Sequence, residues 1–185
     1  MNVTPTRLPG LMIIEPRIYR DARGAFVETW HRDRYAEAGL DAVFVQDNLS
    51  TSAVGVLRGL HLQWPMAQAK LIAVVAGSIF DVAVDARAGS PTFGAWFGLV
   101  LSADDHRQLY IPEGFAHGFV VISGPATVCY KVNAPYTPAD ETTIAWDDPD
   151  LGISWPVNAP TLSPKDHDGR RLRDIAPARL PRFKG

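Results

Sequence analysis

The sequence contains many short runs of strand-forming residues, which Gly, Pro, Ser and Asp separate at short intervals. Short strands in regular succession, with turn residues between them, are typical of a β-sandwich or β-barrel. The runs that we interpret as strands are residues 11–15, 25–30, 42–46, 54–62, 70–76, 79–85, 97–101, 108–111, 118–122 and 126–132. The sequence therefore predicts one all-β domain over residues 1–185, with no interdomain linker.

Two regions depart from this pattern. Residues 31–38 form the one predicted helix, because Gly39 directly after them relieves the left-handed conformation that commonly ends a helix. Beyond residue 135 the chain is rich in Pro and Asp, and we expect irregular cover over one end of the barrel. Trp146 and Trp155 are the expected packing anchors of this cover.

Composition excludes several functional classes. A net charge of −2 lacks the basic excess that phosphate binding by a nucleic-acid partner needs. No apolar run approaches the roughly 18 residues of a membrane helix, and no signal pattern occurs at the N-terminus. The single cysteine, Cys129, allows no intrachain disulfide, so a reducing compartment is expected. These features predict a soluble cytoplasmic protein that binds neither nucleic acid nor a membrane.

Residues 76–79, Ala-Gly-Ser-Ile, fit a two-residue hairpin turn with glycine first. Such a turn sets Lys70 opposite Asp85 and Val74 opposite Asp81, so that Lys70 shares one face with both carboxylates. The other face of this hairpin is apolar, and we therefore expect the polar row to line a cavity. The alternative is an exposed cross-strand ion pair that contributes little to stability.

Residues 59–70 and 112–117 resemble the two motifs of the cupin superfamily, which implies a jelly-roll barrel, also called a double-stranded β-helix. The second stretch, PEGFAH, matches well and ends at His117. The first stretch normally supplies two histidines and a glutamate to a metal ion, but here Gln63 replaces one histidine and Lys70 replaces the glutamate. An ammonium group repels a cation, and two imidazoles without a third good donor bind metal poorly. The sequence therefore predicts the barrel without a metal ion.

A metal-free barrel with these residues is suited to acid–base chemistry. His61 titrates near neutral pH and can act as a general base, and the Tyr130 phenol can deliver a proton. Lys70, held cationic by Asp85, can stabilise an oxyanion, a contribution of roughly 2.7–4 kcal/mol for one donor. Together these groups predict proton abstraction next to a carbonyl, followed by reprotonation. The alternative is that His61 is a packing residue and Tyr130 a core aromatic with its hydroxyl at the rim.

Several blocks of sequence resemble the dTDP-4-dehydrorhamnose 3,5-epimerase family, from about residue 14 to residue 166. They are FVQDNLS at 44–50, GVLRGLH at 55–61, DVAVD at 81–85, IPEGFAHGF at 111–119 and LSPKD at 162–166. The resemblance implies a homodimeric, cofactor-free cupin that inverts C3 and C5 of dTDP-4-dehydro-6-deoxy-D-glucose to give dTDP-4-dehydro-L-rhamnose. By similarity His61 is the base and Asp166 orients it. Tyr130 is then the acid on the opposite face, and Lys70 contacts the enolate oxygen.

The resemblance also implies a nucleotide site, in which diphosphate favours Arg or Lys and the base favours an aromatic face. Its residues by similarity are Arg23, Phe26, Glu28, Gln46, Asn48, Arg58, His117, Tyr136, Glu141 and Lys165. In this family the early strand pairs with the partner subunit, so Arg23, Phe26 and Glu28 are expected to serve the neighbouring site. Arg58 and His61 have opposite parity on a regular strand, and we expect a β-bulge at Gly59 to turn both towards the cavity.

Two other functions fit the same sequence. A mono-epimerase that acts only at C3 or only at C5 of a related nucleotide-linked 4-keto-6-deoxy sugar would use the same base, acid and lysine. A non-catalytic cupin that binds a sugar nucleotide would retain the arginine and aromatic residues. It would have no need of His61, Tyr130 and Asp166 together.

Overall fold

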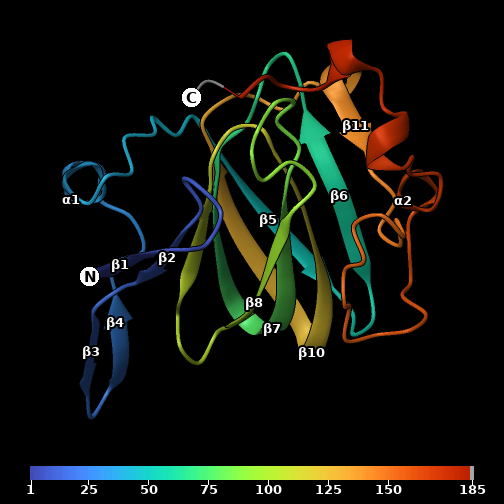
Figure 1. The fold of residues 1–185 in the computed structure, drawn as a ribbon. Coiled ribbons are helices and arrows are strands. Elements are labelled where there is room, and N and C mark those ends of the chain that lie inside the picture. Colours follow the sequence, from blue (N-terminus) through green and yellow to red (C-terminus); the bar gives the residue numbers. More distant parts are fainter. Residues whose placement is uncertain (184–185) are drawn as a thin grey trace.

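The structure, a computed structural model, describes residues 1–183 and is built mainly from antiparallel β-strands (Figure 1). Its strands are β1 (Asn2–Pro5), β2 (Met12–Glu15), β3 (Ile18–Asp21), β4 (Gly24–Val27), β5 (Gln46–Ser52), β6 (Leu57–Gln63), β7 (Lys70–Asp85), β8 (Trp96–Ser102), β9 (Gln108–Ile111), β10 (Phe115–Val132) and β11 (Glu141–Thr143). The helices are α1 (Arg32–Glu37) and α2 (Pro164–His167), with three 3-10 turns, η1 (Pro138–Asp140), η2 (Leu172–Asp174) and η3 (Pro177–Arg179).

Two long bent strands, β7 and β10, run through both halves of the barrel and pair with each other along their length. The first part of β7 and the last part of β10 lie between β9 and β5, in a sheet that continues to β2 and β1. The second part of β7 and the first part of β10 lie between β8 and β6, in a sheet that continues to β11. The two sheets face each other, and this arrangement is the predicted jelly-roll barrel.

The predicted hairpin at residues 76–79 is wrong, because the chain bends at Gly77 without reversing. Gly77 has a φ of +69°, and a Cβ there would lie 2.6 Å from the carbonyl oxygen of Ser123. The pairing of β7 with β10 shifts register between Val121 and Val128, which identifies an irregular bulge. A glycine of positive φ between two apolar runs suits a turn and a bulge equally well, so local sequence did not separate them.

The bulge changes which residues of β7 face the barrel interior. Ile72 and Val74 before the bend, and Ile79 and Ala83 after it, belong to the same core cluster, so the inward parity switches from even to odd. Alternate residues of a strand face the same side, so even-numbered residues before the bend and odd-numbered residues after it point inward. Lys70 and Asp81 therefore do share the interior face, as predicted, although a bulge and not a turn is the cause.

The predicted bulge in β6 is confirmed. His61 is paired with His117 and Arg58 with Phe119, so two residues of β6, Gly59 and Leu60, lie opposite one residue of β10, Gly118. Gly59 takes a φ of +114°, and a Cβ there would lie 2.6 Å from both the Cα of Gly118 and the carbonyl of His117. Because only glycine fits this close approach, Arg58 and His61 can face the same side of the sheet.

The second sheet is buried on both faces. Its inner face contributes to the barrel core, whereas Leu60, Val82 and Val84 on its outer face pack against Ile144 and Leu172 of the C-terminal region. Figure 1 shows this region, in orange and red, lying against β6. Burying these apolar side chains of the outer face, at about 1.5–3 kcal/mol for each large one, is what holds the C-terminal region against the barrel.

The C-terminal region is the expected cover, although it contains β11 and α2, which the sequence did not reveal. Trp155 is a packing anchor as predicted: its ring lies edge-on to Phe80, with 5.9 Å between ring centroids. Its Nε1 donates to the carbonyl oxygen of Trp146, 2.8 Å away. The cover is therefore irregular in backbone and still fixed in place by specific contacts.

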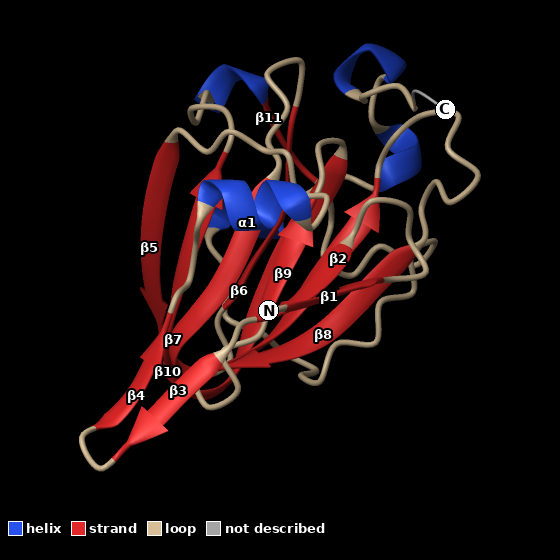
Figure 2. Cartoon of the chain, turned by 90° about the vertical axis from the view of Figure 1, so that its left-hand side faces the viewer, coloured by secondary structure: helices blue, strands red, loops and turns tan. Residues whose placement is uncertain are grey.

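The N-terminal region differs from expectation in its strand boundaries. β3 and β4 form a two-stranded hairpin that projects from the barrel (Figure 2), where the sequence predicted a turn and one strand over residues 25–30. The helix α1 is confirmed, with His31 as its N-cap residue and Gly39 at a φ of +91°. The run at residues 42–46 is not a strand before Gln46, where β5 begins.

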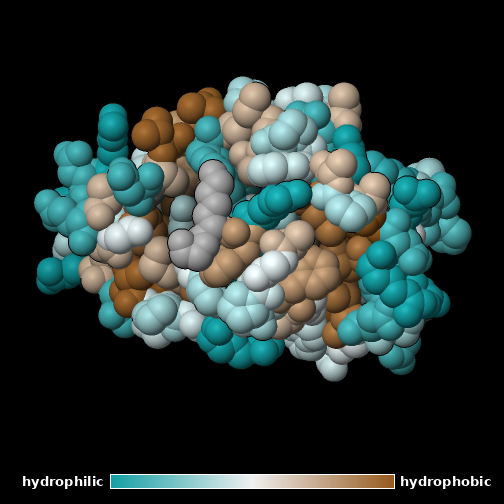
Figure 3. All heavy atoms as spheres, turned by 45° about the horizontal axis from the view of Figure 1, so that its top comes forward, coloured by the Kyte–Doolittle hydropathy of each residue, from teal (hydrophilic) through white to brown (hydrophobic). Residues whose placement is uncertain are grey.

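Within residues 1–183, no helix is both long and apolar enough to cross a membrane. On the face shown in Figure 3, hydrophobic side chains form separate patches among hydrophilic ones.

Candidate active site

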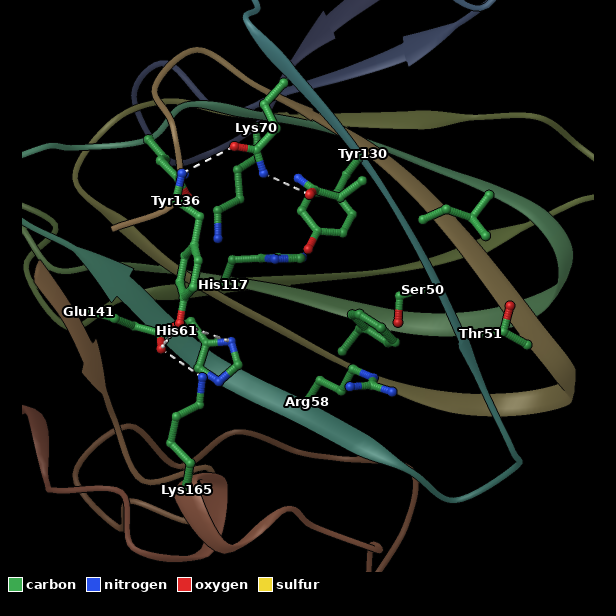
Figure 4. A pocket seen from close by; sticks show the side chains of 15 residues that line it. Ser50, Thr51, Arg58, His61, Lys70, His117, Tyr130, Tyr136, Glu141 and Lys165 are labelled. Atoms are coloured by element: carbon green, nitrogen blue, oxygen red, sulfur yellow. Dashed lines mark hydrogen bonds and ion pairs between the residues drawn. The ribbon is translucent and has the colours of Figure 1, made fainter. Parts of the chain in front are cut away.

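A cavity of about 520 Å³ opens between the two sheets of the barrel (Figure 4). Ligand pockets in proteins are typically about 300–1,000 Å³, so this cavity can hold a nucleotide sugar at least in part. Its lining comes from β5, β6, β7, β10, α2, the loop before β7 and the segment around β11. The lining residues are Gln46, Asn48, Leu49, Ser50, Thr51, Arg58, His61, Gln68, Lys70, His117, Phe119, Tyr130, Tyr136, Glu141 and Lys165.

His61 and Asp166 form a hydrogen-bonded pair at the edge of this cavity. His61 Nε2 lies 2.6 Å from Asp166 Oδ1, and Ser163 Oγ donates to the other carboxylate oxygen at 2.8 Å. Burial raises the pKa of Asp166, but these hydrogen bonds from His61 and Ser163 outweigh it and hold the pKa below its usual value. An ionised Asp166 accepts from Nε2–H, which leaves Nδ1 of His61 as the nitrogen that can take a proton.

Asp166 reaches His61 because α2 begins at Pro164. Ser163 is its N-cap residue, and the Ser163 hydroxyl accepts from the backbone N–H of Asp166 at 3.2 Å. A serine followed by proline is a common start for a helix, since it satisfies one free backbone donor and fixes the first φ. This one-turn helix packs against β6 and orients the carboxylate towards His61.

Lys70 projects into the cavity from the start of β7 (Figure 4). Burial lowers the pKa of Lys70 to about 8, and the nearby carboxylates of Glu141 and Asp81 oppose this shift. The ammonium form is therefore present at neutral pH but is lost at moderately alkaline pH.

The predicted pairing of Lys70 with Asp85 is wrong. Asp85 is at the other end of β7 and accepts hydrogen bonds from Arg87 Nε, Ser90 Oγ and Thr92 Oγ1 at 2.9, 2.7 and 2.7 Å. Because β7 runs on through the bend at residue 77, its two ends lie in different sheets. Asp85 therefore anchors the loop between β7 and β8 and does not contribute to the cavity.

Tyr130 lies on the last part of β10, opposite Ile72 of β7 and Asn48 of β5. It therefore belongs to the sheet that faces the one carrying His61. Figure 4 shows its hydroxyl directed into the cavity. Burial raises the pKa of Tyr130, so the phenol keeps its proton at neutral pH and can donate it.

A second histidine–carboxylate pair lines the same cavity. His117 Nε2 lies 2.7 Å from Asp81 Oδ1, and both side chains are buried. Burial lowers the pKa of His117, although Asp81 opposes the shift, while the positive charges of Lys70 and His61 add to it. His117 is therefore neutral at pH 7, with Nδ1 free of the bond to Asp81.

Glu141 on β11 links three other cavity residues. Its carboxylate accepts from Lys165 Nζ at 2.6 Å and from the Tyr136 hydroxyl at 3.1 Å, and it lies 3.9 Å from His61 Nδ1. Burial raises the pKa of Glu141, but the hydrogen bond from Lys165 and the charge of His61 give a net lowering. Glu141 thus stays ionised and gathers Lys165 and Tyr136 at one side of the opening.

Arg58, Gln46 and Asn48 form the polar wall of the cavity on β5 and β6. Arg58 Nε donates to Ser52 Oγ at 2.9 Å, which leaves the terminal guanidinium nitrogens for a ligand. Gln46 Nε2 donates to Asn48 Oδ1 at 2.8 Å.

The sequence prediction missed several cavity residues, among them Ser50 and Phe119. Gln46, Asn48 and Ser50 alternate along β5, and Phe119 is two residues beyond His117 on β10. Since alternate residues of a strand face the same side, the correct bounds of β5 would have indicated Ser50, and the position of His117 would have indicated Phe119. Gln68, in the loop before β7, carries no such signal.

Arg23, Phe26 and Glu28 do not reach this cavity. Arg23 pairs with Asp21 at 2.6 Å and Glu28 pairs with Arg34, both outside the barrel. Phe26 is 68% exposed on the projecting β3–β4 hairpin. Of the predicted site residues, these three are the ones that the structure does not bring together with the others.

The donor set around His61 and His117 does not fit a divalent metal ion. Within the described part of the chain, no group of three or more His, Cys, Asp or Glu side chains is arranged to hold one. Lys70 is close enough to lower the pKa of His117, and an ammonium group offers no lone pair to a metal.

Comparison with known proteins agrees with this geometry. A family model described as dTDP-4-dehydrorhamnose 3,5-epimerase matches residues 5–174. A dTDP-4-dehydrorhamnose 3,5-epimerase of Shigella flexneri is 51% identical over 176 residues, which cover 94% of this chain and 97% of that protein. A dTDP-4-dehydrorhamnose 3-epimerase of Streptomyces niveus is 43% identical over 182 residues, covering 97% of this chain and 88% of that protein.

A solved structure is similarly close. The dTDP-6-deoxy-D-glucose-3,5-epimerase of Legionella pneumophila, in complex with dTDP-4-keto-L-rhamnose, superimposes with a TM-score of 0.97 at 49% identity. The match covers 100% of this chain and 99% of that one. The chain belongs to the dTDP-4-dehydrorhamnose 3,5-epimerase family.

Proposed function

We propose that this chain is an isomerase that inverts C3 and C5 of dTDP-4-dehydro-6-deoxy-D-glucose and gives dTDP-4-dehydro-L-rhamnose, without a metal or other cofactor. One observation carries the proposal: the His61–Asp166 pair, the Tyr130 phenol and the Lys70 ammonium line one cavity, with His61 and Tyr130 on facing sheets. Two relatives that are 51% and 49% identical to this chain are named 3,5-epimerases.

In the proposed mechanism, C3–H and C5–H are acidic because both carbons flank the C4 ketone. His61 Nδ1 accepts the proton, the electron pair of the C–H bond forms a double bond between that carbon and C4, and the carbonyl π pair moves onto the C4 oxygen to give an enolate. Asp166 stabilises the imidazolium through Nε2–H, at 2.6 Å. The Lys70 ammonium stabilises the enolate oxygen, an interaction that is strongest when the negative charge has formed.

Reprotonation from the other side completes each inversion. Tyr130 donates its proton to the opposite face of the same carbon, and the C4 ketone re-forms. Its raised pKa keeps the phenol protonated until this step. The phenolate then takes a proton from water and His61 releases one, so the site returns to its starting state before the second carbon reacts.

The remaining cavity residues are suited to the nucleotide. The free guanidinium nitrogens of Arg58 match diphosphate oxygens, and Lys165 adds a second positive charge. Tyr136 is 49% exposed, and its ring offers a stacking face to thymine. Gln46, Asn48, His117 and Glu141 then complete the proposed substrate-binding set.

Arg23, Phe26 and Glu28 fit this proposal if the protein is a homodimer with strand exchange. The β3–β4 hairpin pairs only with itself within the described residues, and Tyr19 and Phe26 on it are exposed. An aromatic ring and an arginine on a projecting hairpin are suited to closing the nucleotide site of a second subunit. We place this one-domain enzyme in the cytoplasm, with no nucleic-acid or membrane partner.

The alternative is a mono-epimerase that acts at C3 or C5 of a related nucleotide-linked 4-keto-6-deoxy sugar, as the Streptomyces niveus relative is named for C3 alone. Proton NMR of dTDP-4-dehydro-6-deoxy-D-glucose in heavy water separates the two. Deuterium uptake at both C3 and C5, with the rhamno product, is expected. Uptake at one carbon would make it a mono-epimerase, and binding of the substrate without any uptake would make it a non-catalytic cupin.

A further inference from the structure

Gln63 is the residue of the first cupin-like motif whose role the proposed mechanism leaves open. It ends β6 two residues after His61 and is only 6% exposed. A buried primary amide must satisfy two donor hydrogens and an acceptor oxygen, since a buried polar group left unpaired is destabilising. Its hydrogen-bond partners therefore indicate what the residue is for.

All the hydrogen bonds of the Gln63 amide go to backbone groups on neighbouring loops. Nε2 donates to the carbonyl oxygen of Pro135, 3.1 Å away, and to that of Met66. Oε1 accepts from the backbone N–H of Thr137 at 2.8 Å. The amide thus bonds the residue before Tyr136 and the residue after it.

Tyr136 itself is held by a second glutamine. Its backbone N–H donates to Gln46 Oε1 at 3.2 Å, so side chains from β5 and β6 bind three consecutive residues, 135–137. The ring of Tyr136 is half exposed, and its hydroxyl bonds to Glu141. Because about half of Tyr136 is exposed, the position of its stacking face depends in part on how firmly this backbone segment is held.

We propose that Gln63 is a positioning residue that presents Tyr136 to the nucleotide base. The inference rests on the proposed nucleotide site but not on the epimerisation chemistry. A position that commonly supplies a metal ligand in cupins supplies here an amide that fixes a binding loop. Gln63 does not touch the reacting carbons, so its effect is expected in nucleotide affinity and not in the chemical step.

The test is calorimetric titration of the full-length protein with dTDP. Gln63→Met keeps the side-chain volume and removes all three hydrogen bonds. It should raise the dTDP Kd about tenfold, because the stacking of the base on Tyr136 is weakened. Gln63→Glu keeps the acceptor for Thr137 and loses both donated bonds, and it should weaken binding in the same direction. At saturating substrate, kcat should change less than about threefold.

A double-mutant cycle with Tyr136→Ala separates positioning from a general loss of structure. Once the ring is absent, Gln63→Met should change the dTDP Kd by less than about twofold, because residues that act through each other are not additive. An equal effect in both backgrounds would overturn the inference. So would an unchanged Kd in Gln63→Met or, should that variant fail to fold, in Gln63→Glu.

Deuterium uptake by the wild-type protein is measured alongside. If the wild type binds dTDP but exchanges no proton, the proposed reaction fails while the result for Gln63 stands. If exchange occurs and the Gln63 variants bind dTDP normally, the inference fails while the proposed reaction stands.

Discussion

The cavity contains two histidine–carboxylate pairs that are nearly equal in length and very different in surroundings. His61 and Asp166 lie 2.6 Å apart, with 24% of the His61 side chain exposed. His117 and Asp81 lie 2.7 Å apart, with 9% of the His117 side chain and none of Asp81 exposed. Similar bonds therefore occur at the edge of the cavity and inside the barrel wall.

The partners of each carboxylate explain what each pair can do. Both oxygens of Asp166 are hydrogen-bonded, to His61 and Ser163, so the carboxylate is well stabilised as an anion. Only one oxygen of Asp81 is bonded, since Oδ2 is buried without a partner in the described structure. A base that must become positively charged is better served by the first pair, because an accessible imidazolium keeps some contact with water.

The difference teaches that a hydrogen bond to a carboxylate does not make a histidine a base. Burial lowers the pKa of His117, so it takes up a proton less readily than an ordinary histidine. Its role in the proposal is to bind substrate as a neutral imidazole.

The largest expected effect comes from exchanging the two histidines separately for asparagine. His61→Asn should lower kcat by about 10⁴-fold and abolish deuterium uptake at both carbons, because it removes the only proposed base. His117→Asn should lower kcat/KM much less, by about 10–100-fold. Proton NMR of the substrate in heavy water measures both. Equal losses would remove the distinction between the two pairs.

Tyr130→Phe tests whether the neutral His117 can replace the phenol as the acid. Without the phenol, kcat for inversion should fall by about 10²–10³-fold, while dTDP affinity is unchanged. His61 can still remove a proton and return deuterium to the same face, so exchange without inversion should persist. Retained inversion would assign the acid to another group in the cavity. A collapse of dTDP affinity would place Tyr130 in the binding site instead.

Alkaline pH should inactivate the site through Lys70, which lies near the His117–Asp81 pair and Glu141. Its pKa is lowered by burial to about 8, so the ammonium is present below this pH and is lost as the pH rises through it. kcat/KM, which reports groups of the free enzyme, should then fall about tenfold per pH unit above pH 8. The raised pKa of Tyr130 keeps the phenol out of this range.

Lys70→Met provides the control for this pH profile. The variant should be slower at every pH and should lack the decline that begins near pH 8. A decline that persists in the variant would assign the titration to a different group.

Asp85→Asn should have the smallest effect on turnover. Asp85 does not contact Lys70, so kcat and its pH profile should match the wild type. The free energy of unfolding should fall by about 1–3 kcal/mol, because Asp85 accepts bonds from Arg87, Ser90 and Thr92. Urea unfolding at pH 7 measures this. A slower reaction with unchanged stability would contradict this and would show that Asp85 contributes to the active site.

The pH dependence of the stability that Asp85 contributes gives a second test by urea unfolding. Burial raises its pKa, but the hydrogen bonds from Arg87, Ser90 and Thr92 outweigh it and lower the pKa overall. Its contribution to stability is thus present above its unfolded pKa and is lost as the pH falls through the folded one. The stability difference between wild type and Asp85→Asn should shrink under acid conditions.

Much of the barrel was predictable because strand periodicity and turn residues are local signals. β9 was predicted with its exact bounds, and the bulge at Gly59 followed from the opposite parity of Arg58 and His61. The bend at Gly77 was predicted as a turn, because a glycine of positive φ fits both and only the partner strand β10 distinguishes them.

By itself, the sequence determined the class of fold, the family and most of the residues that line the cavity. Strand periodicity and motif spacing are properties of residues close in sequence, so they can be recognised without knowing how the chain packs. Only the tertiary structure decided the partners of two carboxylates: Asp81 binds His117, and Asp85 binds Arg87 and not Lys70. The Asp81–His117 pair depends on where β7 and β10 meet, and the continuous course of β7 through Gly77 puts Asp85 at the opposite end of the strand from Lys70. No short stretch of sequence encodes either result.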